Sequence, residues 1–324
     1  MRLGACLAVL FLCGCASVEP LPKWITPPSD QDREALLSGE QVPGVGENDR
    51  PARYDLMALS PPMRTLAQEL MRQHRRPDER AEALHRALLA APLYGGQGMR
   101  YTALNTSTAQ DAFRTRSVNC LSFTLIYVAM AREMGLDVRV NDVRVPPTWE
   151  WREGEPFVLF RHVNAKVMLR GGEQLVVDLE MQRYSPAYSQ ELIGDRLVAA
   201  QFYNNRGMEL VAEGELADGF LHLRQALALD DQQSYIWNNL GTLYNRLEEG
   251  RLAELAYLQG LSLDLTDLTL MSNLDSLYRQ RGDREKAAYF SQRRRLTAIT
   301  TRTICMPWRS NIWSRMTWHW RSTI

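Results

Sequence analysis

A spacing of 34 residues constrains the C-terminal part of this chain more than any other feature. Gly207, Gly241 and Asp275 lie 34 residues apart. Large side chains stand four positions before each of them and small residues stand twelve positions after: Tyr203, Trp237 and Met271, then Gly219, Ala253 and Ala287. A unit that recurs at this period buries its apolar face only by stacking on its neighbours. We therefore predict about three stacked helix hairpins over residues 200–296, in which the small residues let paired helices approach closely.

This pattern resembles the tetratricopeptide repeat. The resemblance implies an all-α array whose concave groove binds a peptide or a protein partner. Two alternatives remain for the same residues, an appendage that serves packing alone and a dimerisation surface.

Cys120 is the first candidate for chemistry. The polar turn Arg116–Asn119 leads into residues 121–134, which are apolar nearly all round and predict a buried helix ending at Gly135. A thiol at the start of a helix lies at the positive end of the helix dipole, which favours thiolate over thiol. Cys120 is therefore a candidate nucleophile.

The histidine that could serve Cys120 is chosen by its place in the chain. Helices are predicted at 62–74, 77–90 and 108–114, and strands at 99–104, 137–145, 157–169 and 175–179. A buried helix before an antiparallel sheet indicates an α+β domain. Of the five histidines, only His162 lies in this predicted sheet; the others are His74, His85, His222 and His319. A lone histidine on a strand is more often structural, and that remains the alternative.

The turn between the last two predicted strands decides whether Asp178 can reach His162. A three-residue loop over Arg170–Gly172 pairs Leu169 with Glu173 and places Asp178 opposite Asn164. Asp178 is then diagonal to His162, with Cβ atoms about 7 Å apart. Such a loop needs a left-handed residue near its end, which Gly172 supplies. Cysteine, histidine and aspartate in this order are the parts of a nucleophilic acyl-transfer site.

Residues 95–185 resemble the transglutaminase-like cysteine enzymes of the papain-type superfamily. The matching blocks are Thr108–Phe113, Asn119–Phe123, Ala131–Arg139, His162-Val163 and Val177-Asp178. The resemblance implies a helix-plus-antiparallel-sheet domain over 53–195, with Cys120 as nucleophile, His162 as general base and acid, and Asp178 as the residue that orients the imidazole. Two positions depart from the family. Asn164 stands where tryptophan is frequent, and Asp178-Leu179-Glu180 stands where Asp-x-Thr is frequent.

Three aromatic residues are candidates for the lining of the substrate cleft. Trp149 and Trp151 are predicted to wall the substrate cleft, with packing against the sheet as the alternative, and Tyr101 is a further candidate for its lining. No cofactor is expected. Metal binding is disfavoured because one cysteine, one histidine and one carboxylate make a poor closed site.

The N-terminus predicts targeting to a bacterial envelope. Arg2 precedes an apolar run, residues 3–12, that is too short to span a bilayer. Leu12-Cys13-Gly14-Cys15 resembles a lipoprotein signal, so residues 1–15 are the predicted signal with Cys15 lipidated, and an ordinary signal peptide is the alternative. Ala16, with no aspartate beside it, resembles outer-membrane sorting with the protein facing the periplasm. Residues 16–52, rich in proline and glycine, are predicted to be a tether.

The remaining cysteines and charges add two constraints. Five cysteines, three of them in or next to the signal, form no disulfide framework and leave Cys120 as a free thiol. The 38 basic and 38 acidic residues give a net charge of zero, which does not support a nucleic-acid partner. The basic, tryptophan-rich tail at 297–324 matches either a membrane-interface segment or a disordered extension. We favour the second and assign the tail no function.

Taken together, these features predict a membrane-anchored, cysteine-dependent enzyme that hydrolyses or transfers amides through a thioester, with repeats that recruit a protein. The alternative is a non-catalytic envelope scaffold or binding lipoprotein that uses the repeat groove.

Overall fold

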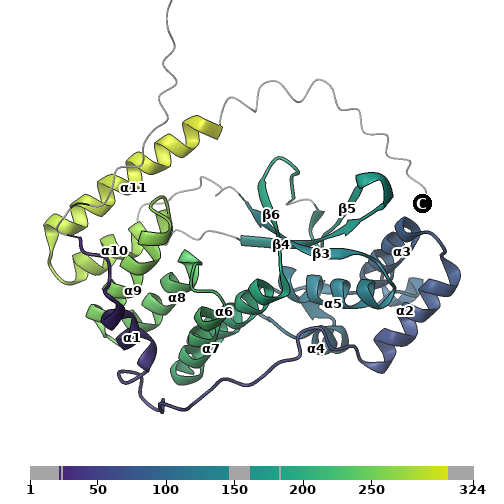
Figure 1. Cartoon of the computed structure of the whole chain (residues 1–324), viewed down its shortest axis with the longest axis horizontal. Helices are drawn as coiled ribbons and strands as arrows, with labels where there is room; N and C mark the ends of the chain where they lie inside the picture. Colours follow the sequence, from purple (N-terminus) through teal and green to yellow (C-terminus); the bar gives the residue numbers. More distant parts are fainter. Residues whose placement is uncertain (1–21, 23–24, 146–160, 182–183, 306–324) are drawn as a thin grey trace, which may run out of the picture.

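The chain folds as an α+β protein with a helical C-terminal region (Figure 1). The structure, a computed structural model, describes residues 22, 25–145, 161–181 and 184–305. Within these residues lie a four-stranded antiparallel sheet, helices that pack beside it, and an array of helix hairpins. This confirms the predicted α+β class and a helical region after the sheet.

The sheet and its central helix form the core of the first half. The strands occur in the order β5-β4-β3-β6 and are β3 Val138–Arg144, β4 Arg161–Met168, β5 Gln174–Val177 and β6 Ser189–Ile193. Helix α5, Cys120–Glu133, lies against β4 and β3 and is buried on nearly every side. The apolar sheet residues Val140, Val163 and Ala165 are buried in the same core. The residues before α5 form helices α2 Pro61–Gln73, α3 Pro77–Leu89 and α4 Ala109–Thr115, and a short parallel pair, β1 Arg100–Tyr101 with β2 Ser117–Val118.

The β4–β5 hairpin has the predicted register. Leu169 N donates to Glu173 O at 2.8 Å, and Ala165 pairs with Val177, so Asn164 lies opposite Asp178 one step further along. Gly171 and Gly172 have φ of 80° and 83°, a conformation that favours glycine. The three-residue loop is therefore confirmed. Within the described residues β4 begins at Arg161; the first four residues of the strand predicted at 157–169 lie outside them.

Six consecutive helices make up the described part of the C-terminal region, which we call the repeat region. They are α6 Asp195–Glu213, α7 Leu216–Leu229, α8 Ser234–Arg246, α9 Gly250–Leu263, α10 Leu268–Gln280 and α11 Arg284–Cys305. They pair as three hairpins along this stretch, α6 with α7, α8 with α9 and α10 with α11. The region begins at Asp195 rather than at 200. Helix α11 continues through residue 297 to Cys305, so the predicted start of the tail is wrong by several residues.

The segment predicted to be a tether is partly folded against the repeat region. Helix α1, Asp30–Ser38, begins at a capping box formed by Ser29 and ends at Gly39, whose φ is 82°. Leu36 is fully buried, and its carbonyl oxygen accepts a hydrogen bond of 2.7 Å from Tyr244 Oη. Arg33 pairs with Asp231 at 2.7 Å. The prediction of a tether is therefore wrong for residues 30–42, because their few apolar side chains, Leu36 above all, pack against the repeat region. From α1 the chain runs along the lower side of Figure 1 to α2.

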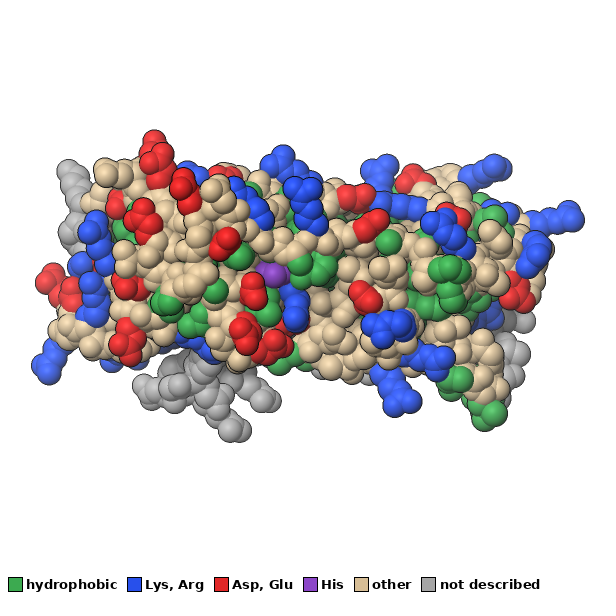
Figure 2. All heavy atoms as spheres, turned by 90° about the horizontal axis from the view of Figure 1, so that it is seen from below, with side chains coloured by type: hydrophobic (Ala, Val, Ile, Leu, Met, Phe, Trp, Pro, Cys, Tyr) green, Lys and Arg blue, Asp and Glu red, His purple; other side chains and the backbone are tan. Residues whose placement is uncertain are grey.

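The surface carries both signs of charge. Figure 2 shows acidic and basic side chains interspersed on the face seen from below. Among the described helices, none has the length and apolar composition needed to cross a membrane.

We predict that Gly241→Ala destabilises the repeat region. A Cβ at Gly241 would lie 2.5 Å from ring atoms of Tyr257, which is 3 % exposed and cannot move away freely. Overpacking of this kind lowers the free energy of unfolding by about 1–3 kcal/mol. Urea unfolding of the full chain, followed by circular dichroism, measures the change.

Gly250→Ala is the matched control. A Cβ at Gly250 has its nearest neighbours at 3.9 Å, in ordinary contact. The control should leave the free energy of unfolding unchanged or raise it by up to about 1 kcal/mol, because alanine restricts the unfolded chain. Equal stability of the two variants would contradict the close approach of α8 and α9.

Candidate active site

The candidate nucleophile lies at the first residue of α5. Asn119 caps the helix, with its Oδ1 accepting from Ser122 N at 2.8 Å. Thr124 Oγ1 donates to Cys120 O at 2.8 Å and contacts Val163 O at 3.4 Å, which ties the first turn of α5 to β4. The thiol of Cys120 is free and partly exposed. Because the first N–H groups of a helix have no partner within the helix, the N–H of Cys120 is a candidate donor to an oxyanion.

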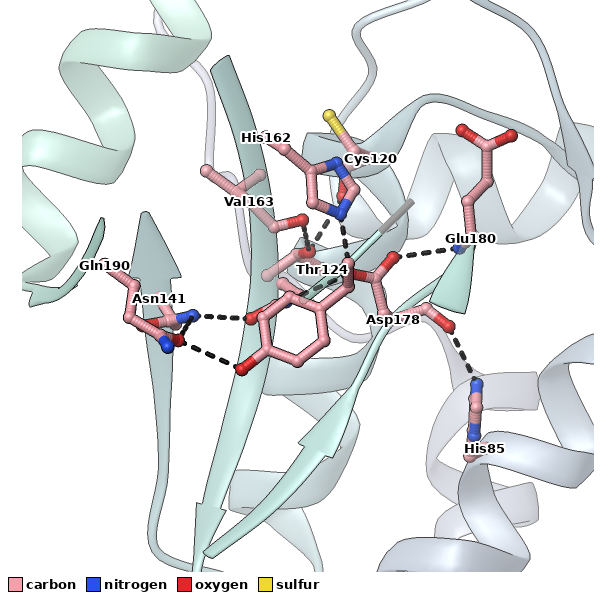
Figure 3. Close-up of polar contacts among 11 residues, drawn as sticks. His85, Cys120, Thr124, Asn141, His162, Val163, Asp178, Glu180 and Gln190 are labelled. Atoms are coloured by element: carbon pink, nitrogen blue, oxygen red, sulfur yellow. Dashed lines mark hydrogen bonds and ion pairs between the residues drawn. The ribbon is translucent and has the colours of Figure 1, made fainter. Parts of the chain in front are cut away.

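His162 lies between the thiol and a carboxylate. His162 Nε2 and Asp178 Oδ2 are 2.6 Å apart, and the two residues are 7 % and 1 % exposed. Figure 3 shows the Cys120 sulfur beside the His162 ring, on the side away from the Asp178 carboxylate. The structure therefore brings together the three residues predicted from the sequence.

Asp178 is held from several directions. Asn164 Nδ2 donates to Oδ2 at 3.0 Å, and Glu180 N donates to Oδ1 at 2.8 Å. The backbone oxygen of Asp178 accepts from His85 Nε2 of α3 at 3.1 Å, so this nitrogen carries the proton (Figure 3). Burial alone would raise the pKa of Asp178, but the hydrogen bonds from His162, Asn164 and Glu180 hold it below its usual value. The carboxylate is therefore ionised and fixed in one orientation.

The charge state of His162 follows from its two partners. Burial of the ring lowers its pKa, but the hydrogen bond to Asp178 and the adjacent Cys120 side chain outweigh burial and raise the pKa of His162 to about 10. The ring is therefore an imidazolium at neutral pH, and it faces a carboxylate on one side and sulfur on the other.

A chain of buried amides behind Asp178 was not predicted from the sequence. Asn141 Nδ2 donates to Asn164 Oδ1 at 2.9 Å and to Gln190 Oε1 at 3.1 Å. Tyr184 Oη donates to the same Gln190 oxygen at 3.1 Å. Asn141 and Asn164 are fully buried. The available signal is the interruption of the valine alternation in β3 by Asn141-Asp142.

Of the three residues predicted to line the substrate cleft, the structure describes only Tyr101. Tyr101 is 45 % exposed on β1, where it pairs with Val118 two residues before Cys120. Its contact with a substrate stays a prediction. Trp149, Trp151 and Cys15 lie outside the described residues. Among the described residues, no group of three or more His, Cys, Asp or Glu side chains could hold a metal ion.

No model of a protein family matches the chain, and no curated protein matches it. The chemistry of the site therefore follows from its own geometry: a thiol at the start of a buried helix lies beside an imidazolium that is hydrogen-bonded to a buried carboxylate.

We predict that the His162–Asp178 pair makes stability depend on pH. The folded protein keeps the His162 proton between the ordinary pKa of 6.5 and about 10, whereas the unfolded chain loses it. The contribution of this residue is full below pH 6.5 and decreases as pH rises, by at most about 1.4 kcal/mol per pH unit. The comparison protein is the double variant His162→Gln/Asp178→Asn, which keeps the approximate shapes of both side chains and removes their charges.

Urea unfolding of both proteins from pH 6.5 to 10 is the measurement. The two proteins share their other titrating groups. The free energy of unfolding of the wild type minus that of the double variant should therefore decrease steadily as pH rises. A difference that stays constant over this range would contradict the charged state assigned to His162.

Proposed function

We propose that this protein is a membrane-anchored cysteine enzyme that processes amides through a thioester. The observation that carries the proposal is the position of His162, with Cys120 on one side of the ring and Asp178 at 2.6 Å on the other. A purely structural histidine needs neither a partly exposed thiol nor an ionised, fully hydrogen-bonded carboxylate. The resemblance to transglutaminase-like enzymes supports the same assignment.

The proposed reaction has two steps. The Cys120 thiolate attacks the amide carbonyl, and the C–N bond breaks as the imidazolium of His162 gives its proton to the leaving amine. A thioester on Cys120 remains, and His162 is neutral. Neutral His162 then takes a proton from water or from an amine, which attacks the thioester and releases an acid or a new amide. The proton on His162 is thereby restored and Cys120 leaves as thiolate.

The other parts of the proposal concern location and partners. Cys15 is the proposed lipid anchor, at an outer membrane facing the periplasm. The hairpins of the repeat region, with their 34-residue spacing and tetratricopeptide-like pattern, are the proposed site for a protein partner. The folded segment 30–42 connects the anchor to the repeat region.

Thiol labelling tests the nucleophile. Iodoacetamide added to the intact protein at neutral pH should modify Cys120 first, as mapped by mass spectrometry. His162→Ala should slow this reaction about tenfold, because an unassisted cysteine is only a few per cent thiolate at pH 7. His74→Ala, at the end of α2, is the control and should leave the rate unchanged.

Acyl transfer separates an enzyme from a reactive thiol. With p-nitrophenyl acetate, the wild type should release p-nitrophenolate and carry an acetyl group on Cys120, and Cys120→Ala should do neither. A slow thiol that is indifferent to His162, together with no acetyl transfer, would leave the scaffold or binding lipoprotein as the function.

A further inference from the structure

Helix α6 makes contacts with the sheet domain along its whole length. At its start, Asp195 forms two hydrogen bonds with Arg132 at the end of α5, at 2.7 and 2.8 Å. In its middle, Gln201 Nε2 donates to Asp142 of β3 at 3.2 Å. Near its end, Glu209 reaches a loop beside the candidate nucleophile. The first helix of the repeat region is therefore also one wall of the sheet domain.

Glu209 is a buried carboxylate with two partners. It is 7 % exposed; its Oε1 accepts from Thr106 N at 2.8 Å and its Oε2 accepts from Arg206 Nη1 at 3.1 Å. A charge is stable in such a place only when it is paired and hydrogen-bonded. Arg206 supplies the opposite charge from the same helix, and Thr106 N, 103 residues earlier in the chain, donates to the other carboxylate oxygen.

The loop that Glu209 holds is bonded on its other side to the first turn of α5. We call residues 105–107 the nucleophile loop. Thr106 Oγ1 accepts from Asn119 Nδ2 at 2.8 Å. Ser107 N donates to Ser122 Oγ at 2.9 Å, and this hydroxyl donates to Asn105 O at 3.3 Å. Asn119 is the cap of α5, and the next residue is Cys120. Each residue of the loop thus contacts the turn that carries the thiol.

We propose that Glu209 is a positioning residue for Cys120, so that the first helix of the repeat region belongs to the catalytic unit. Glu209 fixes Thr106, Thr106 fixes the side chain of Asn119, and Asn119 fixes the helix start at which the sulfur meets His162. The inference rests on the proposed function in that Cys120 is taken as the nucleophile. It assigns to the repeat region a role in the chemistry besides recruitment.

The test uses substitutions on both sides of Thr106. Glu209→Leu removes the acceptor for Thr106 N, whereas Glu209→Gln keeps an oxygen there. Thr106→Val removes the acceptor for Asn119 and leaves the N–H that Glu209 binds, and Thr106→Ser keeps both. Glu213→Leu, an exposed position on the same helix, is the matched control.

Two measurements are made on the full chain. The first is the rate of Cys120 alkylation by iodoacetamide as a function of pH. The second is hydrogen exchange at the amides of residues 106–107 and 121–122, which does not depend on catalysis. Glu209→Leu and Thr106→Val should slow alkylation roughly tenfold, the factor for loss of one buried hydrogen bond, and should change its pH profile. Both should speed exchange. Glu209→Gln, Thr106→Ser and Glu213→Leu should resemble the wild type.

If folded Glu209→Leu shows the same alkylation rate, pH profile and hydrogen exchange as the wild type, the inference is overturned. If Glu209→Leu does not fold, Thr106→Val decides in the same way. Failure of the proposed function is a separate result: wild-type Cys120 would then be slow and indifferent to His162→Ala. In that case exchange alone decides whether Glu209 holds the start of α5, with faster exchange in Glu209→Leu supporting the link and unchanged exchange overturning it.

Discussion

The hydrogen bond between His162 and Asp178 is the interaction on which the candidate site depends. It joins two strands of one hairpin, so its existence is a question of register. A shift of one residue would move Asp178 to the opposite face of the sheet and leave His162 without a carboxylate. The left-handed glycines 171 and 172 set that register by closing the loop after three residues. A turn far from the thiol thus decides whether the imidazole is charged.

The rest of the site converts that pair into a reactive arrangement. Helix α5 is buried almost entirely, so its first residue has little freedom to move relative to β4. Thr124 links the two elements directly, the Asn164 amide donates to Asp178, and the Asn141 amide donates to Asn164 in turn. Buried polar groups are costly unless they are satisfied; Asn164 Nδ2 donates to the carboxylate and Asn141 Nδ2 donates to Asn164 Oδ1, while Asn141 Oδ1 has no hydrogen-bond partner among the described residues. Such preorganisation is what electrostatic catalysis requires.

Sequence patterns were reliable where local rules act and failed where contacts are distant. The apolar run after Cys120 and the Arg170–Gly172 turn predicted α5 and the hairpin, because helix period and turn chemistry are properties of neighbouring residues. The prolines and glycines of residues 16–52 predict a tether. Leu36 has no periodic partners in that segment, so nothing local indicated that it would be buried against the repeat region. His85 and Gln190 were missed as supports of the site for the same reason.

The sequence by itself predicted helices α2–α5 and the three repeat hairpins, strands β1, β3, β4 and β5, the hairpin register and the choice of Cys120, His162 and Asp178, but it did not predict α1, β2 or β6. Only the tertiary structure decided that α6 is shared between the two regions and that Glu209 holds the loop beside Cys120. The physical reason is that a buried hydrogen bond between Glu209 and Thr106 spans 103 residues and leaves no period, spacing or turn signal in either segment. Contacts of this kind exist only after both regions have packed.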